Sequence, residues 1–151
     1  MEDEYAPLQK EFGLPSFAKL DEEFDISTIE SKGKPLQDVL TRMKDRVEHT
    51  VHLLQDLIHP SGDTVMELVE SSFLTQEDKK KLVLIEKDLM VLYREFLVAK
   101  FARENKKDAQ VINDVAEKFP PLRKAILPYI EKIKQGWEKE GESEEVLNYL
   151  G

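Results

Sequence analysis

Four side chains that can bind a divalent metal ion recur between residues 45 and 56. They are separated by four, three and four residues, which places them on one ridge of a helix: Asp45, His49, His52 and Asp56. Imidazole and carboxylate groups bind zinc and other transition metals, so the ridge predicts a metal-binding protein or a metal-dependent enzyme. The ridge faces away from the apolar stripe of the same helix, which favours the alternative of a solvated face whose histidines pair with carboxylates.

A second cluster of functional groups is basic. It comprises Lys100, Arg103, Lys106, Lys107, Arg123 and Lys124. Such side chains can neutralise phosphates, which would suit a nucleic-acid-associated helper protein. The net charge of −9 opposes long-range attraction to nucleic acid, and neutralisation of the acidic ends of the chain is the favoured alternative.

Glu86 is a third candidate because its helical position falls inside an apolar arc, near Leu82 and Tyr93. Burial of a carboxylate is costly unless the group is paired, and such groups often mark function. The alternative is a structural ion pair with a base such as Lys79, and this ordinary interpretation is preferred.

Apolar residues that recur every three or four positions predict the helices that carry these groups. We expect four principal helices, at about 35–59, 76–104, 109–119 and 121–137, with short accessory helices. Thr75 and Asp78 have the spacing of a capping box at the start of the second helix, and Asp108 is expected to cap the third. The pair Pro120 and Pro121 is expected to separate the last two.

The predicted fold is therefore all-α, a compact bundle within a single domain. An acidic N-terminal segment with one short helix (1–33) precedes the bundle core (34–137), and an acidic C-terminal tail (138–151) follows it. The absence of cysteine excludes disulfides, thiolate metal sites and thiol catalysis. Glycine-rich phosphate loops, nucleophile elbows and the Glu-x-x-His pairs of di-iron bundles are also missing.

These features favour a non-enzymatic helical protein-interaction or adaptor module whose protein partner the sequence does not identify. The apolar arc of residues 82–101 is wider than one stripe, which predicts contact with several neighbours and favours a homodimer. Charged residues interrupt every long apolar stretch, so no membrane partner is expected. Without a recognisable signal peptide, the chain is expected to be cytoplasmic. A divalent metal on the Asp/His ridge is the one candidate cofactor.

Overall fold

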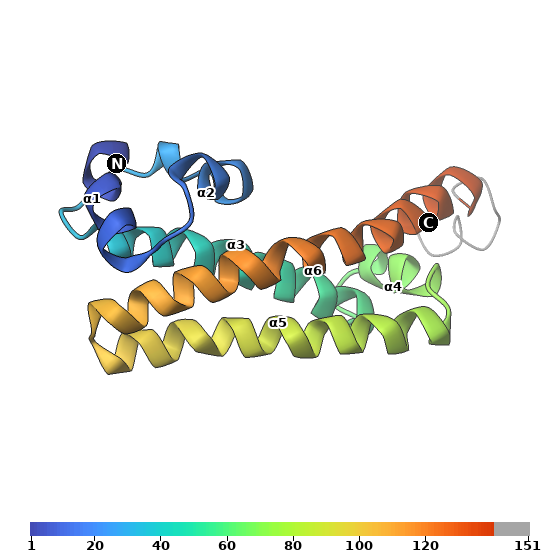
Figure 1. Ribbon diagram of the computed structural model, residues 1–151. Coiled ribbons are helices and arrows are strands. Elements are labelled where there is room, and N and C mark those ends of the chain that lie inside the picture. The colour runs from blue at the N-terminus through green and yellow to red at the C-terminus, as the bar shows by residue number, and fades with distance from the viewer. Residues whose placement is uncertain (141–151) are drawn as a thin grey trace. The chain divides into compact units, whose positions relative to one another are not determined.

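The computed structural model describes residues 1–140, which form an all-α fold without a strand. This confirms the predicted fold class. The elements are α1 (Glu2–Phe12), α2 (Phe17–Phe24), a short 3-10 turn η1 (Ile26–Thr28), α3 (Pro35–Ile58), α4 (Val65–Ser72), α5 (Gln76–Ala102) and α6 (Asn105–Glu140) (Figure 1). None of these helices combines the length and the apolar content needed to cross a bilayer.

The chain divides into two compact units. The first comprises Met1–His49 and Leu89–Pro121, and the second comprises Thr50–Asp88 and the chain from Leu122 onward. The long helices α3, α5 and α6 each contribute residues to both units. Each unit has its own buried apolar side chains.

The core of the first unit includes the N-terminal helices as well as the long ones. Tyr5 of α1 is 1% exposed and Phe24 of α2 is fully buried. The ring of Phe24 lies 5.6 Å from that of Phe119, centroid to centroid. The acidic N-terminal segment therefore contributes to the core and contains two α-helices where one was predicted. The first was missed because Pro7, which removes a backbone donor, lies inside it.

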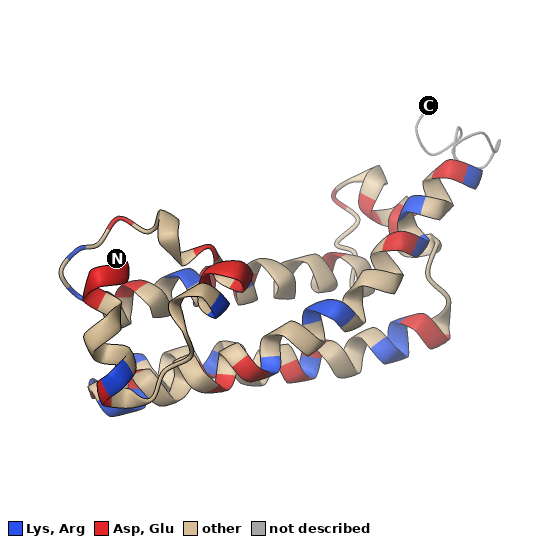
Figure 2. Ribbon diagram, turned by 45° about the horizontal axis from the view of Figure 1, so that its top comes forward, with Lys and Arg blue, Asp and Glu red and all other residues tan. Residues whose placement is uncertain are grey.

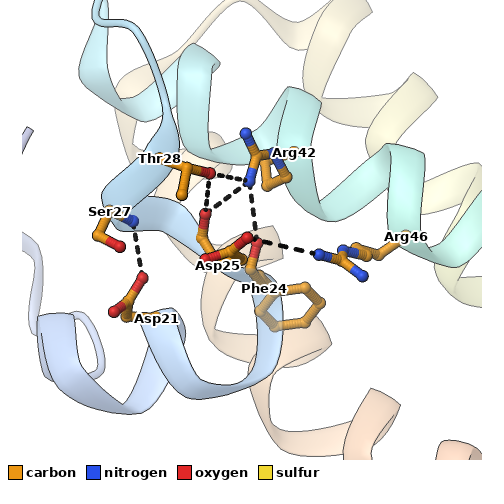
Figure 3. Close-up of polar contacts among 7 residues, drawn as sticks. All are labelled: Asp21, Phe24, Asp25, Ser27, Thr28, Arg42 and Arg46. Carbon is orange, nitrogen blue, oxygen red and sulfur yellow. Dashed lines mark hydrogen bonds and ion pairs between the residues drawn. The ribbon is translucent and has the colours of Figure 1, made fainter.

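Arg42 of α3 joins the N-terminal segment to the bundle through polar contacts (Figure 3). One guanidinium nitrogen, Nη1, donates to the carbonyl oxygens of Phe24 and Asp25, at 3.4 and 2.5 Å, and to Thr28 Oγ1 at 2.9 Å. Arg46 also lies within ion-pair distance of the Asp25 carboxylate, at 4.0 Å. The carbonyl of Phe24 at the end of α2 lacks a partner within that helix, so the arginine satisfies an acceptor that would otherwise need water. The carbonyl of Asp25 also accepts from Thr28 Oγ1, at 2.9 Å.

In the second unit, α4 and the last turns of α6 meet through aromatic side chains. The rings of Phe73 and Trp137 are edge to face, with their centroids 5.4 Å apart. Trp137 Nε1 donates a hydrogen bond of 3.1 Å to Glu70 Oε2. A Cβ atom at Gly136 would overlap the Phe73 ring, so the approach of these elements requires a glycine at this position.

The predicted capping box at the start of α5 is confirmed. The backbone N–H of Asp78 donates to Thr75 Oγ1 at 3.0 Å, and the backbone N–H of Thr75 donates to Asp78 Oδ2 at 2.9 Å. Lys132 of α6 also donates to the Asp78 carboxylate. This hydrogen bond, followed by that from Thr75, lowers the pKa of Asp78 below its usual range.

The predicted break between the last two helices is wrong, because α6 continues through Pro120 and Pro121. The apolar residues before and after the prolines lie in phase on one stripe, and all are buried: Ile112, Phe119, Ile126 and Ile133. Each buried side chain of this kind contributes about 1.5–3 kcal/mol, whereas a proline inside a helix costs about 3 kcal/mol. Continuous burial therefore outweighs the local penalty. Residues 141–151 of the predicted C-terminal tail lie outside the described residues.

Candidate functional site

The four residues of the predicted metal ridge all lie on α3 with exposed side chains. Asp45 and His49 belong to the first unit, and His52 and Asp56 belong to the second. Within residues 1–140, no group of three or more histidine, cysteine, aspartate or glutamate side chains has an arrangement that could hold a metal ion. Metal binding by the ridge stays a prediction without support from the geometry.

Glu86 is mostly buried, as its position in the apolar arc suggested. Its side chain is 17% exposed, and Oε1 lies 4.0 Å from His59 Nε2. Its second oxygen, Oε2, is buried and has no hydrogen-bond partner in the described part of the chain. The neighbouring ionisable group is therefore His59, which directly follows α3. Sequence reasoning suggested Lys79 instead, because only the packing of α3 beside α5 within the second unit shows the histidine.

The predicted basic residues divide between the two units. The first four lie where α5 gives way to α6, a junction at which basic positions gather (Figure 2). Lys100, Arg103 and Lys106 are exposed there, whereas Lys107 is half-buried and lies 3.9 Å from Glu95 Oε2. The other two, Arg123 and Lys124, are exposed in the second unit.

Two of these bases line a cavity of about 430 Å³ in the first unit. Its lining residues come from α3, from the end of α5 and from the start of α6: Gln37, Leu40, Thr41, Lys44, Phe96, Ala99, Lys100, Arg103 and Asp108. We call this cavity the cationic pocket. Lys44 was missed by sequence reasoning because nothing in the spacing of α3 shows which of its sides faces α5.

Asp108 forms part of the pocket wall, which corrects its predicted role as a helix cap. The helix begins three residues earlier, at Asn105, so Asp108 lies in the first turn of α6. It is 4% exposed, and Gln37 Nε2 donates a hydrogen bond of 3.2 Å to Asp108 Oδ2. Burial raises the pKa of Asp108 above its usual range, because the charged form loses its hydration.

The predicted apolar arc of α5 has one buried and one exposed side between residues 89 and 102. Leu89, Leu92, Phe96 and Ala99 are at most 6% exposed. Four other large apolar side chains of this stretch are exposed, and we call these four residues the outer side of α5: Val91 (57%), Leu97 (43%), Val98 (48%) and Phe101 (78%). Contiguous exposed apolar residues of this kind mark interaction surfaces in many soluble proteins.

Two charged residues lie between the apolar positions of the outer side. The guanidinium carbon of Arg94 lies 5.1 Å from the centroid of the Tyr93 ring. Glu95 is partly exposed and pairs with Lys107 of α6. Tyr93 itself donates a hydrogen bond of 3.1 Å to Glu48 Oε1 of α3, so its hydroxyl points toward the bundle. Arg94 and Glu95 thus place one base and one acid in adjacent positions, between Val91 and Val98 in the sequence.

No family model, curated protein or solved structure matches this chain.

Proposed function

We propose that the chain is a non-enzymatic helical protein-interaction module that docks through the outer side of α5, and that its partner there is a second copy of itself. The observation that carries the proposal is the exposure of four large apolar side chains on one helix, with Phe101 at 78%. Removing such surface from water is favourable, and full burial of one aromatic side chain contributes about 1.5–3 kcal/mol.

The order of residues on α5 makes this surface complementary to itself. In a symmetric dimer, if residue i contacts residue j, then residue j contacts residue i. A two-fold axis between Arg94 and Glu95, with the two helices antiparallel, places Val91 opposite Val98 of the second copy. The same symmetry places Arg94 opposite Glu95 twice. In this arrangement the pair of Val91 with Val98 is apolar, and the pair of Arg94 with Glu95 is oppositely charged.

The expected dimer is weak. Stable interfaces bury about 1,200–2,000 Å² in total, whereas weak transient ones bury less, and one side of a single helix is a small interface. Ordering the exposed side chains also costs free energy on association. We therefore expect a dissociation constant in roughly the micromolar range or above.

Sedimentation velocity over a series of protein concentrations tests the proposal. The wild-type chain is expected to shift from monomer to dimer as concentration rises, whereas Val98→Glu stays monomeric. The matched control is Leu127→Glu, which adds the same charge at an apolar residue of α6 in the second unit. The exposed fraction of Leu127 is 50%, against 48% for Val98. The Leu127→Glu variant is expected to dimerise like the wild-type chain. A wild-type chain that stays monomeric, or a dimer that tolerates Val98→Glu, contradicts the proposal.

The two other predicted functions have less support. A metal site on the Asp/His ridge lacks a described group of ligands, and the basic residues proposed for nucleic acid are shared between two units. Both stay predictions.

A further inference from the structure

Three cationic side chains line the cationic pocket without forming ion pairs among the described residues. Two of them come from helices, and the third belongs to the residue that follows α5. They are Lys44 of α3, Lys100 of α5 and Arg103. Within the described part of the chain, none of the three forms an ion pair or a side-chain hydrogen bond. This is notable in a chain with 31 acidic and 22 basic residues, because carboxylate partners are abundant. The one carboxyl group in the pocket wall, Asp108, accepts its hydrogen bond from Gln37.

The floor of the cationic pocket is apolar. Leu40, Phe96 and Ala99 line it and are each at most 9% exposed. The volume of about 430 Å³ lies within the range of roughly 300–1,000 Å³ that is typical of small-molecule sites. An apolar floor below three unpaired cations complements a ligand with an apolar body and an anionic head.

We infer that the cationic pocket binds a small organic anion, whose carboxylate or phosphate head contacts Lys44, Lys100 and Arg103. The apolar body of the ligand lies on Leu40 and Phe96. The charged head gains because hydrogen bonds between ionised groups are stronger than those between neutral groups. Asp108 opposes binding when it is ionised, and burial favours its neutral form.

This inference is independent of the proposed self-association. At about 100° per residue, the pocket residues Phe96 and Lys100 of α5 lie on the opposite side of that helix from Val91 and Val98. A ligand in the pocket therefore leaves the outer side of α5 free. The two proposals can fail separately, because one is tested by ligand binding and the other by the oligomeric state.

Isothermal titration of the full chain with three related compounds tests the inference. Hexyl phosphate and hexanoate carry the anionic head, and hexanol carries the same apolar body without charge. At least one of the two anions is expected to bind with saturation at one site per chain. Its affinity is expected to be at least about tenfold higher than that of hexanol. Which of the two anions binds more tightly identifies the preferred head group.

Pocket variants then locate the site. Lys44→Gln and Arg103→Gly are each expected to weaken anion binding about tenfold, since each removes one charged contact. Arg103 has a backbone φ of 54°, a value that glycine adopts freely, so Arg103→Gly removes the charge without straining the fold. Asp108→Asn is expected to tighten binding. The matched control is Lys118→Gln, which removes a charge from an exposed position of α6 outside the pocket.

The inference is overturned if neither anion binds with saturation, or if hexanol binds as tightly as the anions. It is also overturned if the anions bind Lys44→Gln and Arg103→Gly as they bind Lys118→Gln. Circular dichroism of each variant verifies that the helices are retained, so that a loss of binding reports the pocket and not unfolding.

Discussion

The two sides of α5 between residues 89 and 102 have similar composition and different surroundings. Leu89 and Phe96 on the inner side are 0% and 6% exposed, whereas Val91 and Phe101 on the outer side are 57% and 78% exposed. The inner side belongs to the core of the first unit. The comparison shows that apolar spacing identifies which residues can be buried, while the number of neighbouring helices decides which of them are buried within one chain.

The largest expected difference between the two sides is in stability. Phe96→Ala is expected to lower the free energy of unfolding by about 3–5 kcal/mol, because it leaves a cavity in the core. Phe101→Ala, the matched outer substitution, is expected to change it by no more than about 0.5 kcal/mol. Urea unfolding at a protein concentration too low for association measures both. Equal losses in the two variants would show that Phe101 is also part of the core.

The start of α5 is held by its capping box, and the expected effect there is smaller. Thr75→Ala is expected to cost about 1 kcal/mol, because the backbone N–H of Asp78 loses its acceptor. The comparison variant is Glu77→Gln, which removes an exposed acid in the same turn and is expected to have little effect. A cost for Glu77→Gln equal to that for Thr75→Ala would assign the effect to helix charge and not to the cap.

The stabilisation from Asp78 is expected to depend on pH. Its pKa is lower in the folded state than in the unfolded state, so its contribution is complete above the unfolded pKa and is lost as pH falls through the folded pKa. Asp78→Asn should therefore be less stable than wild type at neutral pH, and the difference should shrink in acid. Urea unfolding at several pH values measures this. A difference that stays constant with pH would contradict the ion-paired state of Asp78.

The end of α5 offers a stabilising change of about 0.5–1 kcal/mol. Arg103 occupies the left-handed region with a φ of 54°, where a Cβ atom is disfavoured. Arg103→Gly is therefore expected to raise the free energy of unfolding. Arg103→Ala removes the same charge and keeps the Cβ atom, so it should not give the gain. Thermal unfolding of the two variants separates backbone conformation from charge.

The smallest expected effect concerns Asp108, and its sign is opposite to that of Asp78. Because burial raises its folded pKa above the unfolded value, its ionisation lowers stability as pH rises through the folded pKa. Asp108→Asn should remove this decline while keeping an acceptor for Gln37. Comparison of the two pH profiles of unfolding free energy measures the effect. Profiles that remain parallel would show that Asp108 ionises freely in the folded chain.

Local patterns in the sequence were sufficient for several features of the fold. The stripe of α3 and the capping box of α5 depend on residues close in sequence, and both are found as expected. The continuity of α6 was missed because the local cost of Pro120 and Pro121 was weighed without the burial on both sides. The phase of the apolar stripe across the prolines was present in the sequence and carried that information.

The candidate sites were less predictable because they depend on how helices turn toward each other. The spacing of His49 and His52 suggested a shared ligand, but spacing on one helix supplies only one side of a site. Lys44 joins Lys100 and Arg103 through the packing of α3 beside α5, which no local pattern encodes. His59 lies near Glu86 for the same kind of reason, within the second unit.

A mixing experiment tests whether the outer side of α5 pairs with the same side of a second copy. In a homodimer, Arg94→Glu places four acids at the proposed two-fold axis, and Glu95→Arg places four bases there. Each variant alone is expected to sediment as a monomer, and an equimolar mixture is expected to form a heterodimer. Variants that self-associate like wild type, or a mixture that stays monomeric while wild type dimerises, would contradict the antiparallel pairing of α5.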